Sequence, residues 1–183
     1  MQSVSYLKEV LVNLEQNVSI VLLNQKQFRT AIDFVLDDIV KKDKQVIFVS
    51  FTMSGEEIIR KFGEHNLIVI DGFSEEQRDT DNIVYIGNKT NLTKVQMAIE
   101  KASDKKDKII VFDSLSVMSI YNSKKDLGKF IYLFNNKISL EGNTCLYFAT
   151  KDSIDEDTVE TAKQFCDKTY DFSDIYISSI HVK

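Results

Sequence analysis

The stretch KIIVFDSLSVMSIYNSKKDLGKFIYLFNNKISLEGNTCLYFAT, residues 108–150, contains a complete strand–helix–strand pattern. Its two ends, IIVF at 109–112 and TCLYFAT at 144–150, are unbroken apolar runs of strand length. Between them Ser123 is placed to cap a helix with apolar residues at helical spacing. These residues are Leu127, Phe130, Ile131, Phe134 and Ile138. Strands that are apolar on both faces and joined through a helix favour a parallel sheet covered on two sides.

The same alternation extends outward in both directions. Apolar runs predict further strands at 18–24, 46–51, 67–70 and 83–86. Helical spacing predicts helices at 4–16, 27–42, 54–62 and 91–102, the last opened by Asn91. Capping boxes at Ser54–Glu57 and Ser153–Glu156 open two helices, and Gly63 is placed to close the first of them. Within the aromatic run 130–134, core packing is expected, with Tyr132 able to face outward.

The C-terminal part carries TYDF at 169–172 and IYISSIHV at 175–182, which predict a terminal β-hairpin. No linker or internal repeat interrupts the chain, so residues 1–183 are expected to form one domain. The predicted fold is a three-layer doubly wound α/β sandwich with a mainly parallel central sheet and a C-terminal antiparallel hairpin.

Composition narrows the possible functions. No stretch of eighteen apolar residues and no secretory signal is evident, so a cytoplasmic protein without a membrane partner is expected. The net charge of −5, without a basic loop carrying interleaved aromatics, disfavours a nucleic-acid partner. Cys145 and Cys166 form no CxxC pair and are expected to be reduced, buried thiols. His65 and His181 have no ligand-spaced neighbours, so no metal site is expected.

Two segments resemble the KaiC-like branch of the RecA ATPase superfamily. VIFVSFTMSGEEIIRKFG, 46–63, is similar to the strand and helix that follow the phosphate-binding helix in that family. Residues 108–172 are similar to its Walker B strand, the next helix and strand, and the last helix. With the strand at 18–24, the resemblance covers nearly the whole chain beyond the first helix. It implies a RecA-like fold in which strand 144–150 lies between strands 18–24 and 108–114.

The resemblance places Asp113 at the Walker B carboxylate, which in active relatives holds the water shell of Mg²⁺. The alternative is that Asp113 caps the helix that follows. In the family the phosphate-binding loop follows the first strand, where this chain reads LLNQKQFRTAIDF, 22–34. That segment has no glycine and is too short for GxxxxGK[ST], so it lacks the backbone cradle for phosphates. If a nucleotide binds at all, the resemblance assigns it to Lys26, Arg29, Thr30 and Asp113.

A second family feature is also missing. Phe51-Thr52-Met53-Ser54 stands where the family has the acidic pair that activates water, and neither threonine nor methionine is a general base at neutral pH. No catalytic residue is therefore expected, and no cofactor. The segment GNKTNLT, 87–93, looks like the end of a Walker motif through Gly87, Lys89 and Thr90, but a turn followed by an Asn91 cap is the favoured interpretation.

Charged residues gather at both ends of the predicted sheet. Lysines follow predicted helices and are expected at the edge of the sheet opposite the ligand crevice. There they complement the helix dipoles; the alternative is that they form a surface for a partner. These are Lys41, Lys42, Lys44, Lys101, Lys105, Lys106 and Lys108. Acidic residues are expected at the crevice, where they disfavour phosphates. These are Glu75, Glu76, Asp79, Asp81, Asp152, Asp155, Glu156, Asp157 and Glu160.

The sequence thus predicts a non-catalytic regulatory or scaffold protein that acts through protein–protein interaction. The resemblance implies a partner that is an active RecA/KaiC-type ATPase or a second copy of this chain, and a setting such as archaeal signalling, where relatives without the loop occur. Helix 4–16 is a candidate docking element, or else it simply covers the sheet. The alternative is a nucleotide sensor or weak ATPase with an unconventional phosphate site.

Overall fold

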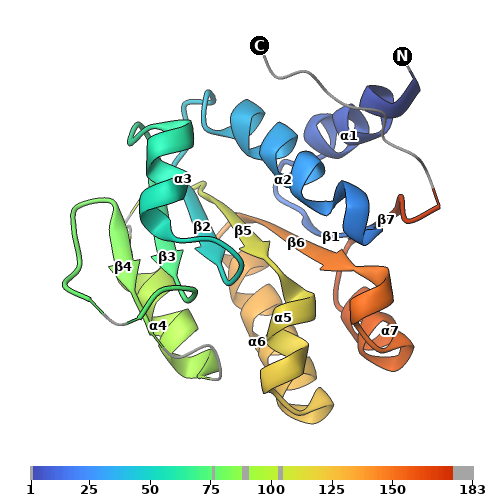
Figure 1. Cartoon of the computed structure of the whole chain (residues 1–183). Helices are drawn as coiled ribbons and strands as arrows, with labels where there is room; N and C mark the ends of the chain where they lie inside the picture. Colours follow the sequence, from blue (N-terminus) through green and yellow to red (C-terminus); the bar gives the residue numbers. More distant parts are fainter. Residues whose placement is uncertain (1, 76, 88–90, 103–104, 175–183) are drawn as a thin grey trace.

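Seven parallel strands form the central layer of the part of the chain that the structure describes (Figure 1). This computed structural model describes residues 2–75, 77–87, 91–102 and 105–174. The strand order is β4-β3-β2-β5-β6-β1-β7, and every pairing is parallel. The strands are β1 Val18–Leu23, β2 Val46–Ser50, β3 Leu67–Asp71, β4 Ile83–Tyr85, β5 Ile109–Asp113, β6 Thr144–Thr150 and β7 Lys168–Asp171.

Helices cover both faces of the sheet. One face carries α1 Gln2–Val12, α2 Gln25–Ile39 and α3 Gly55–Phe62. The other carries α4 Leu92–Ala102, α5 Leu115–Tyr121, α6 Lys124–Leu140 and α7 Glu156–Gln164. A short 3-10 turn, Lys151–Ser153, precedes α7. Because each central strand is buried on both faces, the apolar side chains divide into two cores, one on each side of the sheet.

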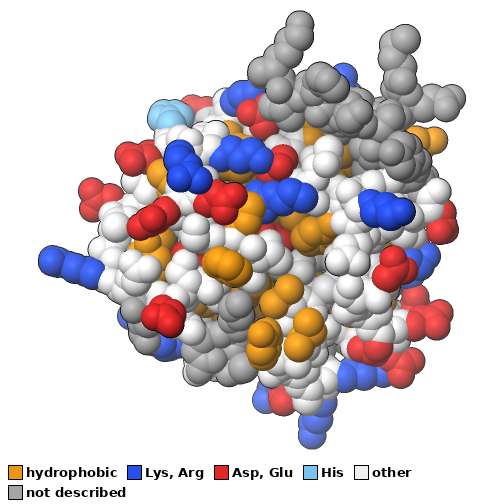
Figure 2. All heavy atoms as spheres, in the orientation of Figure 1, with side chains coloured by type: hydrophobic (Ala, Val, Ile, Leu, Met, Phe, Trp, Pro, Cys, Tyr) orange, Lys and Arg blue, Asp and Glu red, His pale blue; other side chains and the backbone are white. Residues whose placement is uncertain are grey.

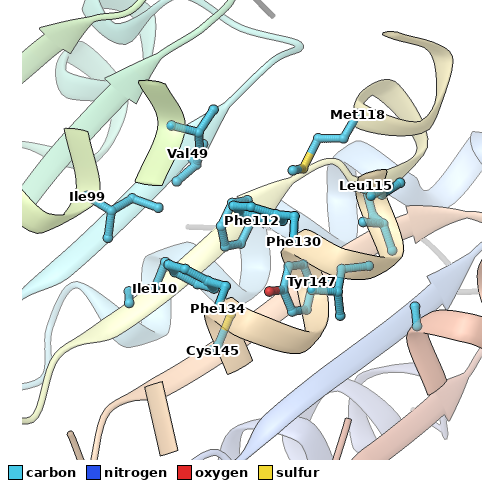
Figure 3. Close-up of a cluster of buried hydrophobic side chains, with 14 of the residues drawn as sticks. Val49, Ile99, Ile110, Phe112, Leu115, Met118, Phe130, Phe134, Cys145 and Tyr147 are labelled. Carbon is cyan, nitrogen blue, oxygen red and sulfur yellow. The ribbon is translucent and has the colours of Figure 1, made fainter. Parts of the chain in front are cut away.

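An aromatic cluster fills the core under α6 (Figure 3). Phe112 of β5 stacks on Tyr147 of β6 with ring centroids 4.8 Å apart. Phe130 and Phe134 of α6 meet the Phe112 ring edge-on at 6.2 and 5.6 Å. The buried Tyr147 hydroxyl donates to Asn135 Oδ1 at 2.8 Å. The cluster therefore joins the two central strands to their covering helix and leaves the tyrosine's polar atom with a partner.

Several predictions are confirmed. Strand β6 lies between β5 and β1, as the resemblance implied. Ser54, Asn91 and Ser123 each accept a backbone N–H three residues ahead in the chain. Gly63 ends α3 with φ of 83°, a conformation that strongly favours glycine. Tyr132 is 47% exposed and does face outward.

One predicted helix start is wrong, one helix is missing from the prediction, and the alternative role weighed for Asp113, as a helix cap, is not observed. Ser114, not Asp113, caps α5, because the Ser114 hydroxyl accepts the Val117 N–H. The α5 helix itself has seven residues, too few for its apolar spacing to be recognised in the sequence. Asp155, not Ser153, caps α7, since a 3-10 turn takes up the chain as far as Ser153. The Asp155 carboxylate accepts the Thr158 N–H at 2.9 Å.

The C-terminal hairpin stays a prediction, because only its first arm lies among the described residues. Its first arm is strand β7, which pairs parallel with β1 because the chain crosses over through α7 before returning to the sheet. The second arm, 175–182, lies outside the described residues. Among the helices that are described, none is long and apolar enough to cross a membrane.

The first helix covers the sheet rather than presenting an apolar face to solvent. It ends at Val12, four residues before the predicted end. Its buried apolar side chains, together with Leu14 just beyond it, face the core that α2 also covers, whereas Tyr6 and Val12 are exposed; the buried ones are Leu7, Val10, Leu11 and Leu14. A docking role for this helix would therefore require it to leave the core.

Candidate functional site

The junction between β1 and α2 is a single residue, Asn24. Its side-chain oxygen accepts the Gln27 N–H at 3.1 Å, and its amide nitrogen donates to the Ser173 carbonyl at 3.0 Å. The N-terminus of α2 is thus capped by the chain's own side chain. A one-residue junction has no length in which consecutive N–H groups can wrap a phosphate.

We expect Asn24→Ala to lower the free energy of unfolding by about 1–2 kcal/mol, because the cap of α2 is lost. Asn24→Asp keeps the capping oxygen and should lose less than the alanine variant, since only the donation to Ser173 disappears. Urea unfolding of the three proteins measures the difference. Equal losses in the two variants would show that the cap contributes nothing.

Asp113 ends β5 with its carboxylate fully buried. Thr52, just beyond β2, donates its hydroxyl to Asp113 Oδ2 at 2.5 Å. The other oxygen, Oδ1, has no hydrogen-bond partner among the described residues. Burial raises the pKa of Asp113 to about 6, against the lowering effects of the Thr52 hydroxyl and the Arg29 charge.

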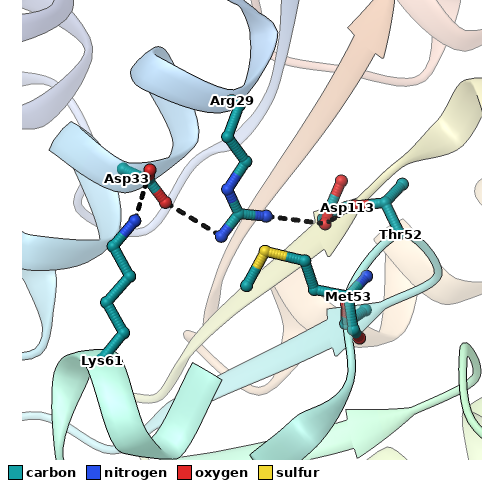
Figure 4. Close-up of polar contacts among 7 residues, drawn as sticks. Arg29, Asp33, Thr52, Met53, Lys61 and Asp113 are labelled. Atoms are coloured by element: carbon teal, nitrogen blue, oxygen red, sulfur yellow. Dashed lines mark hydrogen bonds and ion pairs between the residues drawn. The ribbon is translucent and has the colours of Figure 1, made fainter. Parts of the chain in front are cut away.

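Charged side chains of α2 and α3 extend from this carboxylate (Figure 4). Arg29 Nη1 lies 4.0 Å from Asp113 Oδ2, and Arg29 Nη2 lies 2.9 Å from Asp33 Oδ1. Lys61 Nζ reaches Asp33 Oδ2 at 2.5 Å. Neither arginine contact has hydrogen-bond geometry, so both are ion pairs without a directed bond. We call Thr52, Asp113, Arg29, Asp33 and Lys61 the Arg29–Asp113 network.

The network is balanced in charge, with two cations and two carboxylates. Arg29 connects the carboxylate at the end of the sheet to the helix covering it, and its guanidinium points at Asp113 (Figure 4). A ligand that bound Asp113 Oδ2 or the Arg29 guanidinium would have to displace contacts that the chain already makes, whereas Asp113 Oδ1 is unused. The neighbouring Ser50 hydroxyl donates to the Met53 carbonyl at 2.7 Å, which holds the turn after β2 closed.

The structure brings together only some of the residues predicted for a nucleotide. Arg29 and Asp113 meet, whereas Lys26 is exposed and Thr30 half-buried, and neither takes part in the network. Sequence reasoning missed Asp33 and Lys61. Asp33 could have been found, because it lies four residues after Arg29 on a helix. Lys61 could not, since only the packing of α3 beside α2 brings it near.

Asp71 is a second buried carboxylate that the sequence did not single out. It ends β3 and is fully buried. Its oxygens accept the backbone N–H groups of Gly55, Phe73 and Ser74 and the Ser74 hydroxyl, all at 2.7–2.8 Å. Asp71 therefore ties the start of α3 to the loop after β3, and its acceptors are used within the fold.

The first of the two predicted lysine clusters is paired with carboxylates. Lys41, Lys42 and Lys44 pair with neighbouring carboxylates, as expected of solvated side chains. In the 87–93 segment Asn91 accepts the Lys94 N–H, which agrees with the cap, while Lys89 and Thr90 lie outside the described residues.

Cys145 is buried and Cys166 half-buried. Within the described ranges, no group of three or more His, Cys, Asp or Glu could hold a metal ion.

Comparison with known proteins identifies the fold of this chain but does not assign it to a family. No protein-family model and no curated protein matches the chain. Among solved structures, an uncharacterized protein from Pyrococcus horikoshii, crystallised in complex with an unknown peptide, aligns with a TM-score of 0.65 at 12% identity, over 86% of this chain and 77% of that one. The flagellar accessory protein FlaH from Methanocaldococcus jannaschii aligns with a TM-score of 0.58 at 14% identity, over 86% and 71%. The chain has the RecA-like α/β fold of these archaeal proteins.

Proposed function

We propose that this chain is a non-catalytic regulatory or scaffold protein that acts by binding another protein. The observation that carries the proposal is the Arg29–Asp113 pair: the carboxylate that would hold a metal's water shell instead faces a guanidinium of the chain itself. The one-residue junction at Asn24 supports the same conclusion, because it leaves no phosphate cradle.

The four described residues 51–54 offer no candidate base, which further supports the proposal. Around the end of β2, Thr52 donates to Asp113 and Ser54 caps α3. Phe51 and Met53 are buried and apolar. None of these side chains can accept a proton from water at neutral pH. We propose that the fold has been retained for its shape rather than for hydrolysis.

The comparisons add a setting for this role. One similar structure was solved with an unknown peptide, and another is a flagellar accessory protein, both from archaea. We propose that this chain likewise binds a protein partner, either an active RecA/KaiC-type ATPase or a second copy of itself, in archaeal signalling or a comparable assembly.

The test is a calorimetric titration of the purified protein with ATP and Mg²⁺. We expect no heat at protein concentrations of tens of micromolar, which excludes binding tighter than about millimolar. The matched control is a titration with Mg²⁺ alone. A saturable, Mg²⁺-dependent heat would contradict the proposal.

A nucleotide sensor is the second candidate, and one observation favours it. Asp113 Oδ1 is buried without a hydrogen-bond partner among the described residues, so one acceptor at this edge is unused. On this hypothesis ATP binding would require Mg²⁺ and would be abolished in Asp113→Asn, whereas Lys26→Ala, at an exposed position outside the network, would weaken it less. Binding that Asp113→Asn leaves intact would contradict a role for Asp113.

A further inference from the structure

Within the described residues, Arg29 alone forms an ion pair with the buried Asp113. The Asp113 oxygen Oδ2 accepts the Thr52 hydroxyl, and Oδ1 has no hydrogen-bond partner in that part of the chain. Arg29 Nη1 lies 4.0 Å from Oδ2, which is too far for a hydrogen bond. A buried carboxylate is costly unless a positive charge or hydrogen bonds compensate it. Arg29 therefore supplies Asp113 with charge but not with a directed bond.

The other cation of the Arg29–Asp113 network does not duplicate this role. Lys61 Nζ contacts Asp33 Oδ2 at 2.5 Å, and Arg29 Nη2 lies 2.9 Å from Asp33 Oδ1. If the guanidinium is removed, Lys61 still compensates Asp33, whereas Asp113 keeps only the Thr52 hydroxyl. The network then loses its charge balance, and the uncompensated negative charge lies at Asp113.

The Arg29 side chain also separates Asp113 from solvent. The arginine side chain is 34% exposed, whereas that of Asp113 is 0% exposed. Figure 4 shows the guanidinium between Asp33 and Asp113, where both of its terminal nitrogens are buried. Acidic and basic side chains gather on the surface over α2 and α3 (Figure 2). Truncation of Arg29 therefore opens a path from a hydrated, charged surface to the carboxylate.

We propose that Arg29 is a built-in cation that takes the place of a divalent metal ion at Asp113, and that its removal alone makes this edge of the sheet a metal site. This inference rests on the proposed non-catalytic role and assigns the loss of metal binding to one residue. The ligand is a hard divalent cation such as Mg²⁺ or Mn²⁺, which takes oxygen ligands and keeps several waters. The Asp113 oxygens and the Thr52 hydroxyl are ligands of this kind.

The experiment is a titration of the full chain with Mn²⁺ at about pH 8 and low salt, read as loss of the free-Mn²⁺ signal in electron paramagnetic resonance. We expect Arg29→Ala to gain one site with a dissociation constant of about 1 mM or below, whereas the wild type gains none. Arg29→Gln also removes the charge but keeps a polar side chain, so it serves as a second variant if the alanine protein does not fold.

A second measurement of the same binding is thermal unfolding with and without Mn²⁺. A ligand that binds only the folded state raises the unfolding temperature. We therefore expect Mn²⁺ to raise the unfolding temperature of Arg29→Ala and to leave that of the wild type unchanged. The gain should disappear from both measurements when Asp113→Asn is added to either Arg29 variant.

Two further variants separate the site from a general effect of charge. Lys26→Ala removes one positive charge from the same helix, at an exposed position outside the network, and should bind no more Mn²⁺ than the wild type. Arg29→Lys keeps a cation next to Asp113 and should likewise gain no site. Both comparisons are matched, because each changes one side chain of α2 by a single, defined property.

The proposal is overturned if neither Arg29→Ala nor Arg29→Gln gains Mn²⁺ binding, or if the gain survives Asp113→Asn or appears equally in Lys26→Ala. It is also overturned if the wild type binds Mn²⁺ in a way that depends on Asp113. The ATP titration uses the wild type, so heat in that titration contradicts the non-catalytic role whatever Arg29→Ala does. A silent ATP titration without a gain in the Arg29 variants removes this inference alone.

Discussion

Phe112→Ala should lower the free energy of unfolding by about 3–5 kcal/mol, the largest loss expected from any single substitution considered in this protein. The Phe112 side chain is fully buried and contacts the rings of Tyr147, Phe130 and Phe134. Its removal loses the transfer free energy of the ring and leaves a cavity where two strands meet their covering helix. Chemical denaturation followed by circular dichroism measures the loss as a shift of the midpoint with an unchanged slope.

Two variants serve as controls for this prediction. Phe112→Leu keeps most of the buried volume and should lose less than half as much stability. Leu140→Ala removes a side chain that is 90% exposed at the end of α6, and should change the free energy of unfolding by less than about 0.5 kcal/mol. If Phe112→Ala and Leu140→Ala lost similar amounts, the cluster under α6 would not be the centre of this core.

The second large effect is a dependence of stability on pH that arises from Asp113. In the folded protein this carboxyl releases its proton near pH 6, whereas its ordinary pKa is 3.8. Between these values the folded state binds more protons than the unfolded state, so the free energy of unfolding falls as pH rises. The contribution of Asp113 to the free energy of unfolding is therefore most favourable below about pH 4 and least favourable above about pH 6. The full change is about 3 kcal/mol.

Urea unfolding of the wild type and of Asp113→Asn, between pH 4 and pH 7, isolates this contribution from those of other carboxylates. We expect the stability of the wild type relative to Asp113→Asn to fall across this range. Arg29→Met should extend the fall above pH 6, because the guanidinium charge lowers the pKa of Asp113 and its loss lets the pKa rise further. A difference between wild type and Asp113→Asn that is independent of pH would show that the carboxylate is ionised throughout.

The Arg29–Asp113 network links the fold to the proposed function. Parallel strands end at a common edge, and Asp113, Thr52 and the N-terminal half of α2 meet there. In a nucleotide-binding protein of this fold, that edge is open to ligand. In this chain a side chain of α2 bridges it, and the cap at Asn24 closes the end of the helix. The proposal of a non-catalytic protein follows because the chain's own side chains fill this edge of the sheet, and the ATP titration tests it.

The sequence by itself determined the strands and most of the helices, and the family resemblance implied that strand 144–150 lies between strands 18–24 and 108–114. The runs at 109–112 and 144–150 are apolar on both faces, and only a doubly covered parallel sheet buries them fully. Ser54, Gly63, Asn91 and Ser123 mark helix ends through local hydrogen bonds, which depend on residues within three or four positions. Such short-range hydrogen bonds can be predicted from the sequence because they need no tertiary contact.

Only the tertiary structure decided how the ends of the strands are used. Arg29 and Asp113 are 84 positions apart in the chain, and Lys61 reaches Asp33 only because α3 lies beside α2. The direction of β7 likewise depends on where α7 returns the chain to the sheet, not on its four residues. Charge pairs and strand partners of this kind are set by the packing of distant segments, so no periodicity or local spacing reports them.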